Sequence, residues 1–220
     1  MQKVKTVEEA LTYINDGMSL MIGGFLGVGT PDVMIDALVA KGTNNLEIIC
    51  NDTSFVDKGI GKLIVSKQVR KVVTSHIGTN AETGRQMNAG EIEVVLSPQG
   101  TIAEQVRAAG AGLGGVITPT GIGTVVEEGK QKIVIDDKEF LVEKPLKADV
   151  ALIRCNKADT KGNLYYDKAA RNFNPLMAMA ADFVIAEVDE IVEVGEIDPH
   201  LVHTPGLFVN VMVKGAKCNG

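Results

Sequence analysis

Short apolar runs alternate with longer amphipathic stretches along most of the chain. The apolar runs are too short for helices and are bounded by glycine, proline or polar residues, which is typical of strands. The longer stretches place apolar residues at helical spacing. The pattern predicts strands at 19–22, 46–50, 71–75, 93–96, 149–153 and 183–186, and helices at 6–16, 31–41, 60–66 and 101–109.

Two of the predicted helices carry signals at their amino ends. Thr6 and Glu9 have the spacing of a capping box. Thr30 is a favourable N-cap, and Pro31 is a favourable first helical residue. The glycine-rich segment 23–29 is therefore expected to join a short strand to a helix.

Strands that alternate with helices predict an α/β fold with a mostly parallel open sheet, helices on both faces and glycine-rich loops. The apolar runs 133–135 and 140–142 flank the polar residues 136–138 and predict a β-hairpin excursion. Segment 110–123 is crowded with glycines and is expected to be an irregular loop. We expect residues 1–220 to form one domain.

Composition narrows the function. The 220 residues carry a formal net charge of −6, from 22 basic and 28 acidic side chains, which argues against nucleic acid or an anionic membrane as the main partner. The three cysteines, Cys50, Cys155 and Cys218, are far apart and form no CxxC pair. Neither a disulfide framework nor a metal site is expected. No apolar run approaches the roughly 20 residues that a spanning helix needs, and we expect a cytoplasmic protein.

The glycine segment does not fit the common nucleotide-binding patterns. Gly27-Val28-Gly29 lacks the third glycine of a dinucleotide fingerprint, and Thr30-Pro31 stands where a P-loop has its lysine and hydroxyl. Glycines after a strand still let a ligand approach the backbone, and the next helix would offer unpaired N–H groups to a phosphate or carboxylate. A tight connection without a ligand remains the alternative.

The segment also resembles the first signature of the class I coenzyme A-transferases, and the similarity covers nearly the whole chain. It is specific to the α subunit of the two-subunit short-chain fatty-acid or 3-oxoacid enzymes. The signature occupies 16–31, with Asp16-Gly17, Leu20 to Phe25 and Gly29-Thr30-Pro31 as its fixed positions. Further matching segments are 51–53, 75–78, 98–101, 110–112, 118–121, 123–130, 162–164 and 170–175.

The resemblance implies an activity. Family enzymes move coenzyme A (CoA) from an acyl-CoA to a free carboxylate without ATP, through a glutamyl-CoA thioester. The family's glutamate lies in a Ser-Glu-Asn-Gly motif of the β subunit, and this chain has no Glu-Asn-Gly. The resemblance therefore implies an α subunit that is active only with a β subunit, as α₂β₂ or a larger assembly. CoA would be a substrate, with no permanently bound cofactor. The sequence leaves acetate, butyrate and acetoacetate open.

The resemblance also assigns site residues. Gln99 matches a glutamine that lends an amide donor to the oxyanion hole, with a helix-capping role as the alternative. Glu128, beside Glu127, is the nearest imitation of the nucleophile, but this segment belongs to the α half and is not expected to serve. Asn51 and His76 follow predicted strands and are expected to fix loops. The residues expected to hold CoA are Gly23, Gly24, Phe25, Leu26, Gly27, Val28 and Gly29.

Two rival functions remain at this point. Sugar-phosphate isomerases and glucosamine-phosphate deaminases share a similar α/β unit, but they would work without a partner chain and their motifs have no match here. A non-catalytic sensor of a phosphorylated metabolite could use the same loop.

Overall fold

A computed structural model describes residues 3–216, and Cys218 lies outside this range. The helices are α1 (Val7–Leu11), α2 (Asp32–Lys41), α3 (Gly61–Val65), α4 (Ala81–Asn88), α5 (Gln99–Gly110) and α6 (Asn174–Met179). The strands are β1 (Ser19–Ile22), β2 (Leu46–Ile49), β3 (Val69–Thr74), β4 (Glu93–Leu96), β5 (Val116–Thr118), β6 (Lys132–Ile135), β7 (Lys138–Glu143), β8 (Ala148–Asp159), β9 (Leu164–Tyr165), β10 (Ala181–Val192) and β11 (Val211–Lys214). Four 3₁₀ turns complete the described elements: η1 (Val125–Glu127), η2 (Lys168–Arg171), η3 (Pro199–Leu201) and η4 (Gly206–Phe208).

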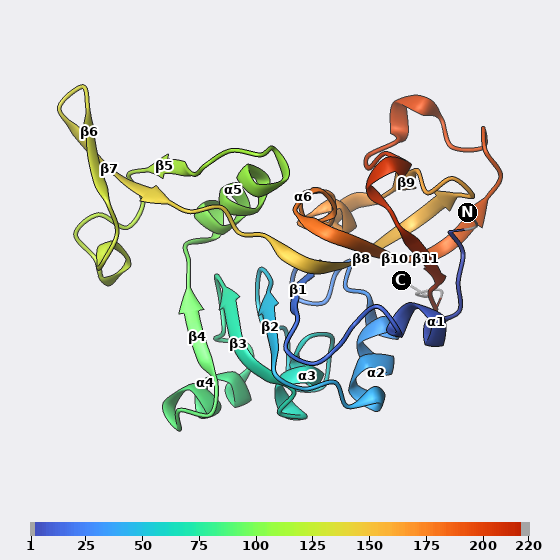
Figure 1. The fold of residues 1–220 in the computed structure, drawn as a ribbon, viewed down its shortest axis with the longest axis horizontal. Helices are drawn as coiled ribbons and strands as arrows, with labels where there is room; N and C mark the ends of the chain where they lie inside the picture. The colour runs from blue at the N-terminus through green and yellow to red at the C-terminus, as the bar shows by residue number, and fades with distance from the viewer. Residues whose placement is uncertain (1–2, 217–220) are drawn as a thin grey trace.

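The main sheet is open and mostly parallel, as predicted (Figure 1). Its strand order is β11-β10-β8-β1-β2-β3-β4, and every neighbouring pair along this path is parallel. Among the described strands of this sheet, only β9 pairs antiparallel, on β8. Because the strands are parallel, their carboxyl ends meet at one edge of the sheet, where ligand sites usually form in such folds.

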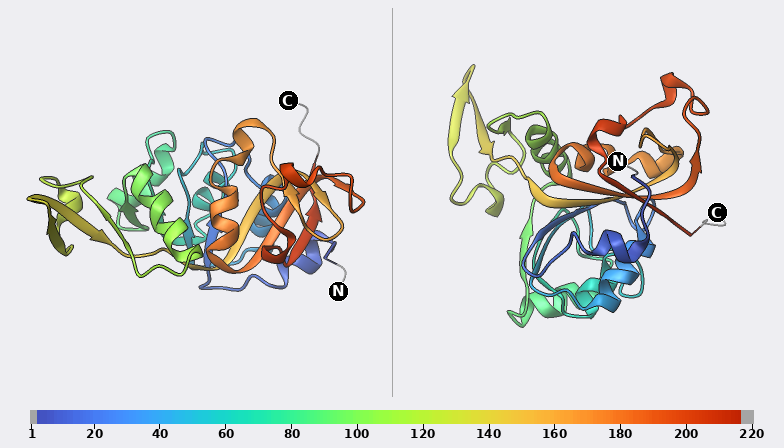
Figure 2. Two further views of the ribbon diagram at one scale, coloured as in Figure 1. Left: turned by 90° about the horizontal axis from the view of Figure 1, so that it is seen from above. Right: turned by 45° about the vertical axis from the view of Figure 1, so that its right-hand side comes forward.

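Helices cover both faces of the sheet (Figure 2). Strand β1 shows why: Leu20 and Ile22 pack into a core under α1, α2 and α3, whereas Met21 between them packs into a second core under α5 and α6. Side chains alternate across a strand, so each face receives its own apolar set. The two cores also explain why the central strands read as continuous apolar runs.

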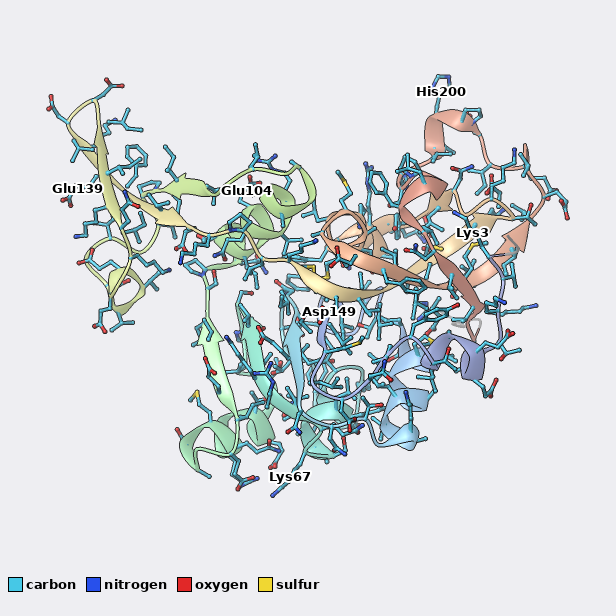
Figure 3. The ribbon with its side chains drawn as sticks, viewed as in Figure 1. Lys3, Lys67, Glu104, Glu139, Asp149 and His200 are labelled. Atoms are coloured by element: carbon cyan, nitrogen blue, oxygen red, sulfur yellow. The ribbon has the colours of Figure 1, made fainter. Side chains whose placement is uncertain are left out.

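A three-stranded arm, ordered β5-β7-β6, projects beyond the main sheet; Glu139 marks it in Figure 3. The expected hairpin is confirmed, because β6 and β7 pair antiparallel around Asp136 and Asp137. Both residues have positive φ, 50° and 59°, as a two-residue hairpin turn that follows the strand twist requires. The expected loop at 110–123 is partly wrong, since β5 forms within it and pairs with β7.

Several predicted boundaries also differ. The Thr6–Glu9 capping box is confirmed, but α1 ends at Leu11 instead of 16. Helix α2 begins after Pro31, and Thr30 is not its N-cap: the Thr30 side chain is buried and its carbonyl accepts from Asp32 N. Helix α4 was not predicted, and β8 and β10 are longer than expected because they pair with each other over most of their length. Within residues 3–216 no helix is long and apolar enough to cross a bilayer.

Candidate functional site

A cavity of about 380 Å³ lies at the carboxyl edge of the main sheet. It gathers the residues that follow β1, β2 and β3 and the first residue of α5, as the parallel topology requires. The expected positions of Asn51 and His76 at strand ends are confirmed. The lining residues are Phe25, Leu26, Asn51, Asp52, Ser75, His76 and Gln99.

The glycine segment forms a tight reverse turn after β1. Phe25 and Val28 exchange both backbone hydrogen bonds, at 3.0 and 2.9 Å. The two central residues, Leu26 and Gly27, have φ of 47° and 88°. Phe25, Leu26 and Val28 are each 39–48% exposed, so the turn presents apolar side chains at its tip.

The base of this turn is held by a late segment of the chain. Asn174, fully buried, donates from Nδ2 to the carbonyls of Gly29 (3.0 Å) and Ala170 (2.8 Å). Asn172 donates to the carbonyl of Val28 at 2.9 Å. A Cβ on Gly23 would lie 1.8 Å from the Asn174 Oδ1. Glycine is therefore required at the base because another backbone and a buried amide approach closely.

The N–H groups expected to be unpaired at the start of α2 have a partner within the chain, because a buried carboxyl lies against them. Glu187 on β10 is 1% exposed, and its Oε2 accepts from Met34 N at 3.1 Å. Burial raises the pKa of Glu187 to about 7, although that hydrogen bond and the Arg154 guanidinium oppose the shift. A second anion would have to displace Glu187 from the positive end of the helix.

Glu187 makes stability depend on pH. A carboxyl whose pKa is raised in the folded state holds its proton when the unfolded chain has released it. Stability is therefore expected to fall as pH rises from the ordinary glutamate pKa through about 7, by up to about 3 kcal/mol. We predict that Glu187→Gln removes most of this fall, which unfolding midpoints (Tm) at about pH 5 and about pH 8 would measure.

Asp149→Asn is the matched control for this titration (Figure 3). Hydrogen bonds from Ser19 N and Oγ lower the pKa of Asp149, so its contribution changes only at more acidic pH. The Asp149 variant should therefore keep the wild-type change in Tm between the two pH values. An equal fall in wild type and Glu187→Gln would assign the pH dependence to other groups.

Hydrogen bonds connect the cavity residues to one another. Gln99 Nε2 donates to Asn51 Oδ1 at 2.8 Å, and Asn51 Nδ2 donates to Asp52 Oδ2 at 2.8 Å. Helix α5 has Pro98 as its N-cap and no side-chain cap bond. The alternative that Gln99 caps a helix is therefore wrong. One N–H of its amide remains beyond the bond to Asn51.

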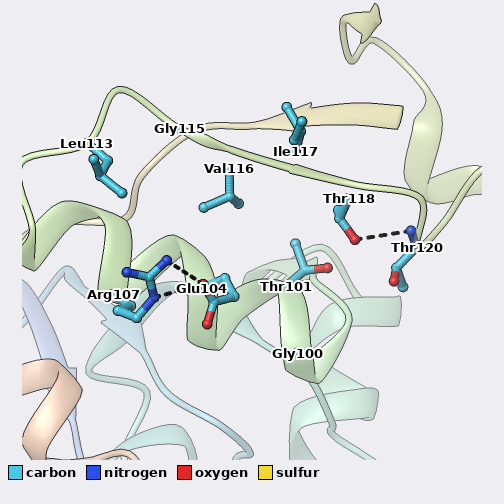
Figure 4. A pocket seen from close by; sticks show the side chains of 10 residues that line it. All are labelled: Gly100, Thr101, Glu104, Arg107, Leu113, Gly115, Val116, Ile117, Thr118 and Thr120. Atoms are coloured by element: carbon cyan, nitrogen blue, oxygen red, sulfur yellow. Dashed lines mark hydrogen bonds and ion pairs between the residues drawn. The ribbon is translucent and has the colours of Figure 1, made fainter. Parts of the chain in front are cut away.

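Two cavities of about 570 Å³ each lie elsewhere. One separates α5 from the segment that carries β5 and contains Arg107, whose guanidinium pairs with Glu104 at 2.8 Å. Figure 4 shows this pair on α5. The other adjoins Gly27 to Gly29 and contains Arg154, which pairs with Asp189 at 2.8 Å. In both, the named guanidinium is paired with a carboxylate, and neither cavity contains Gln99.

The remaining sequence candidates do not join the site. Glu127 lies on the projecting arm, where a hydrogen bond from Gly123 N and an ion pair with Lys132 lower its pKa. Its neighbour Glu128 follows η1 on the same arm. Cys50 and Cys155 are fully buried, and burial raises the pKa of both thiols, that of Cys50 to about 12. Neither thiol is a nucleophile here. Within residues 3–216 no group of His, Cys, Asp and Glu could hold a metal ion.

The family model for coenzyme A transferases matches residues 4–215. The chain belongs to the coenzyme A transferase family. It is 56% identical to the acetate CoA-transferase subunit alpha of Escherichia coli K12, with 96% of each chain covered. It is 49% identical to the acetoacetyl-CoA:acetate/butyrate CoA transferase alpha subunit of Clostridium acetobutylicum, over 96% of this chain and 97% of that one. These relatives support the transferase over both rival functions.

The fold comparison agrees. An acyl-CoA transferase from E. coli O157:H7, solved as a thioester complex with CoA, superposes with a TM-score of 0.89 at 26% identity. The match covers 97% of this chain but 47% of that one. The chain thus spans about half the length of that solved enzyme.

Sequence reasoning missed several residues that build the site. Asp52, Asn172 and Asn174 lie inside segments that carried the resemblance, but no contact with the glycine turn was inferred for them. Their contacts with the glycine turn join distant parts of the chain, and periodicity does not report such pairs. Glu187 had a signal: it is an acidic residue directly after the apolar run 183–186, and a charged group inside a buried strand needs a partner.

Proposed function

We propose that this chain is the α subunit of a CoA-transferase that moves CoA between a short-chain acyl-CoA or 3-oxoacyl-CoA and a carboxylate such as acetate. The nucleophilic glutamate would come from a β subunit with a Ser-Glu-Asn-Gly motif, in an α₂β₂ or larger cytoplasmic assembly. The relatives named as acetate and acetate/butyrate transferases support this substrate range.

The lining of the cavity supports the need for a β subunit. Asp52 is the only carboxylate among the residues lining the cavity, and three donors already occupy it: Leu26 N, Asn51 Nδ2 and Ser54 N, each within 2.9 Å. Neither Cys50 nor Cys155 lines the cavity. The glutamate nucleophile that the proposal requires would therefore enter from another chain.

The cavity suits the reacting end of an acyl-CoA. When a carboxylate attacks the thioester carbonyl, the carbonyl oxygen becomes an oxyanion that requires a preorganised donor. The second N–H of the Gln99 amide would supply it. Phe25 and Leu26 would contact the uncharged acyl and thioester groups, since the amides of Phe25, Leu26 and Val28 are used within the chain and Glu187 fills the start of α2. In this proposal residues 23–29 hold CoA by apolar contact.

The proposal predicts that the chain has no transferase activity by itself. Co-expression with a β subunit carrying Ser-Glu-Asn-Gly should give a complex that transfers CoA from acetoacetyl-CoA or butyryl-CoA to acetate. Chromatography of the acyl-CoA products would measure the transfer. A complex with that glutamate changed to alanine is the control, and it should be inactive although it assembles. Full activity of this chain alone, or an inactive complete complex, would refute the assignment.

A sugar-phosphate isomerase and a metabolite sensor give different results in the same assay. The isomerase would convert a phosphosugar without a partner. The sensor would bind a phosphorylated metabolite and transfer nothing.

A further inference from the structure

Three hydrogen bonds connect the glycine turn to Gln99 in one line. Leu26 N donates to Asp52 Oδ2 at 2.9 Å, Asn51 Nδ2 donates to the same oxygen at 2.8 Å, and Gln99 Nε2 donates to Asn51 Oδ1 at 2.8 Å. Asn51 and Asp52 are 2% and 4% exposed. We call Asp52, Asn51 and Gln99 the amide relay.

Asp52 anchors this relay as an acceptor. Leu26 N and Ser54 N are backbone donors that cannot accept, so Asp52 accepts at both oxygens: Oδ2 from Leu26 N and Oδ1 from Ser54 N. Within residues 3–216 no cation forms an ion pair with it. Backbone and amide N–H groups hold the carboxyl in place.

The acceptor at Asp52 decides the orientation of the next two amides. Because the carboxylate accepts, Asn51 must turn its NH₂ toward Asp52 and its Oδ1 toward Gln99. Because Asn51 Oδ1 accepts, Gln99 must turn its NH₂ toward Asn51. A side-chain amide has a donor end and an acceptor end of nearly equal shape, and packing alone does not choose between them. The second bond to Asn51 Oδ1, from Ser75 Oγ at 3.1 Å, is compatible with this orientation.

We propose that Asp52 is a positioning residue that fixes, through Asn51, the donor end of the Gln99 amide at the cavity, and that the same carboxylate holds the Leu26–Gly27 turn. The inference rests on the proposed function, in which Gln99 donates to the oxyanion. With Gln99 reversed, its carbonyl oxygen would face the developing negative charge and repel it. Asp52 thus orients the Gln99 amide through Asn51 and also holds the turn that faces the coenzyme.

The test is a double-mutant cycle in the assembled α–β complex. Asp52→Asn presents either an NH₂ or a carbonyl to Asn51, so it releases the orientation while conserving size. We expect Asp52→Asn to lower kcat by about tenfold, a part of the hundredfold or more that loss of an oxyanion donor costs. In a Gln99→Ala background the same change should lower kcat less than twofold, because the relay then has nothing to orient and a weaker hold on the turn acts on the KM for acyl-CoA.

Asp159→Asn is the matched control. Asp159 is also buried, and it accepts from the same kinds of donor: Lys161 N, Asn163 N and Asn163 Nδ2. It lines none of the three cavities described above. A purely structural effect of losing such a carboxylate would appear equally in both variants as a lower Tm. Only Asp52→Asn should change kcat in a way that depends on Gln99.

The outcomes are separable. If the wild-type complex does not transfer CoA, the proposed function is refuted and the double-mutant cycle cannot be measured. In an active complex, an equal loss of kcat from Asp52→Asn in both backgrounds, or no loss, would overturn the positioning role. If Asp52→Asn does not fold, Asn51→Ala breaks the relay while leaving Asp52 its bonds to Leu26 N and Ser54 N. Its kcat loss should likewise disappear in the Gln99→Ala background, and an additive loss would overturn the proposal.

Discussion

Replacing Gly29 with valine is expected to destabilise the folded chain by about 2 to 5 kcal/mol. Gly29 has φ of 73°, which costs a side chain with a branched Cβ roughly 1–2 kcal/mol. A Cβ there would lie 2.9 Å from Asn174 Nδ2, 3.0 Å from the Ala170 carbonyl oxygen and 3.1 Å from the Ala170 Cα. Two of these neighbours are backbone atoms that cannot rotate away, and overpacking of this kind costs about 1–3 kcal/mol more.

Gly27→Val is the matched comparison. Its φ of 88° imposes a similar conformational cost, but the only neighbour a Cβ would meet is Ser54 Oγ, at 4.0 Å. The two variants therefore differ mainly in packing. We expect Gly29→Val to have a Tm lower than that of Gly27→Val by about 5 °C or more. Gly27→Val should fold and lose transferase activity, because the turn that faces the cavity changes shape.

The sequence alone treats the two glycines as equivalent: a β-branched residue at Gly27 or Gly29 is expected to cost activity in the complex with little loss of folding. For Gly29 the structure predicts a loss of folding as well, because Asn174 and Ala170 pack against it. Equal Tm values for the two valine variants would contradict the packing explanation. If the Gly29→Val complex has wild-type stability and activity, the close packing of Asn174 and Ala170 against Gly29 has no role in either property.

The main sheet was predictable because its signals are local. Runs such as 19–22 and 46–50 are buried on both faces and read as apolar without interruption, and the hairpin at Asp136 and Asp137 follows from polar turn residues between two strands. Helix α4 was missed because it carries little apolar periodicity: within it, Thr83 and Gln86 are the buried side chains.

The site was only half predictable, because its contacts are not local. Spacing and resemblance indicated the turn and Gln99. The groups that hold the turn, Asn174 and Asp52, reach it across 145 and 26 positions of sequence. The partner of the helix start was not predictable for the same reason, since Glu187 reaches the start of α2 from a strand 153 positions later. A pattern along the chain does not show which N–H groups already donate to a side chain on a distant strand.

Gln99→Ala in the complete α–β complex is expected to lower kcat by about 10²–10³-fold, the usual effect of removing one oxyanion donor. The KM for acyl-CoA should change much less, because the donor acts on charge that develops only in the transition state. Steady-state kinetics with acetoacetyl-CoA and acetate would measure both parameters. A rise in KM at constant kcat would instead make Gln99 a binding residue.

Gln99→Glu separates the catalytic role from a structural one. Glutamate matches glutamine in size, and at the first residue of α5 its charge favours the helix. If Gln99 serves only to begin the helix, the glutamate variant should be as active as wild type and at least as stable. If it donates to the oxyanion, the variant should be at least as impaired as alanine, since a carboxylate offers no N–H and repels both Asn51 Oδ1 and the developing charge. Stability retained together with a loss of kcat is the result that the geometry of the amide relay requires.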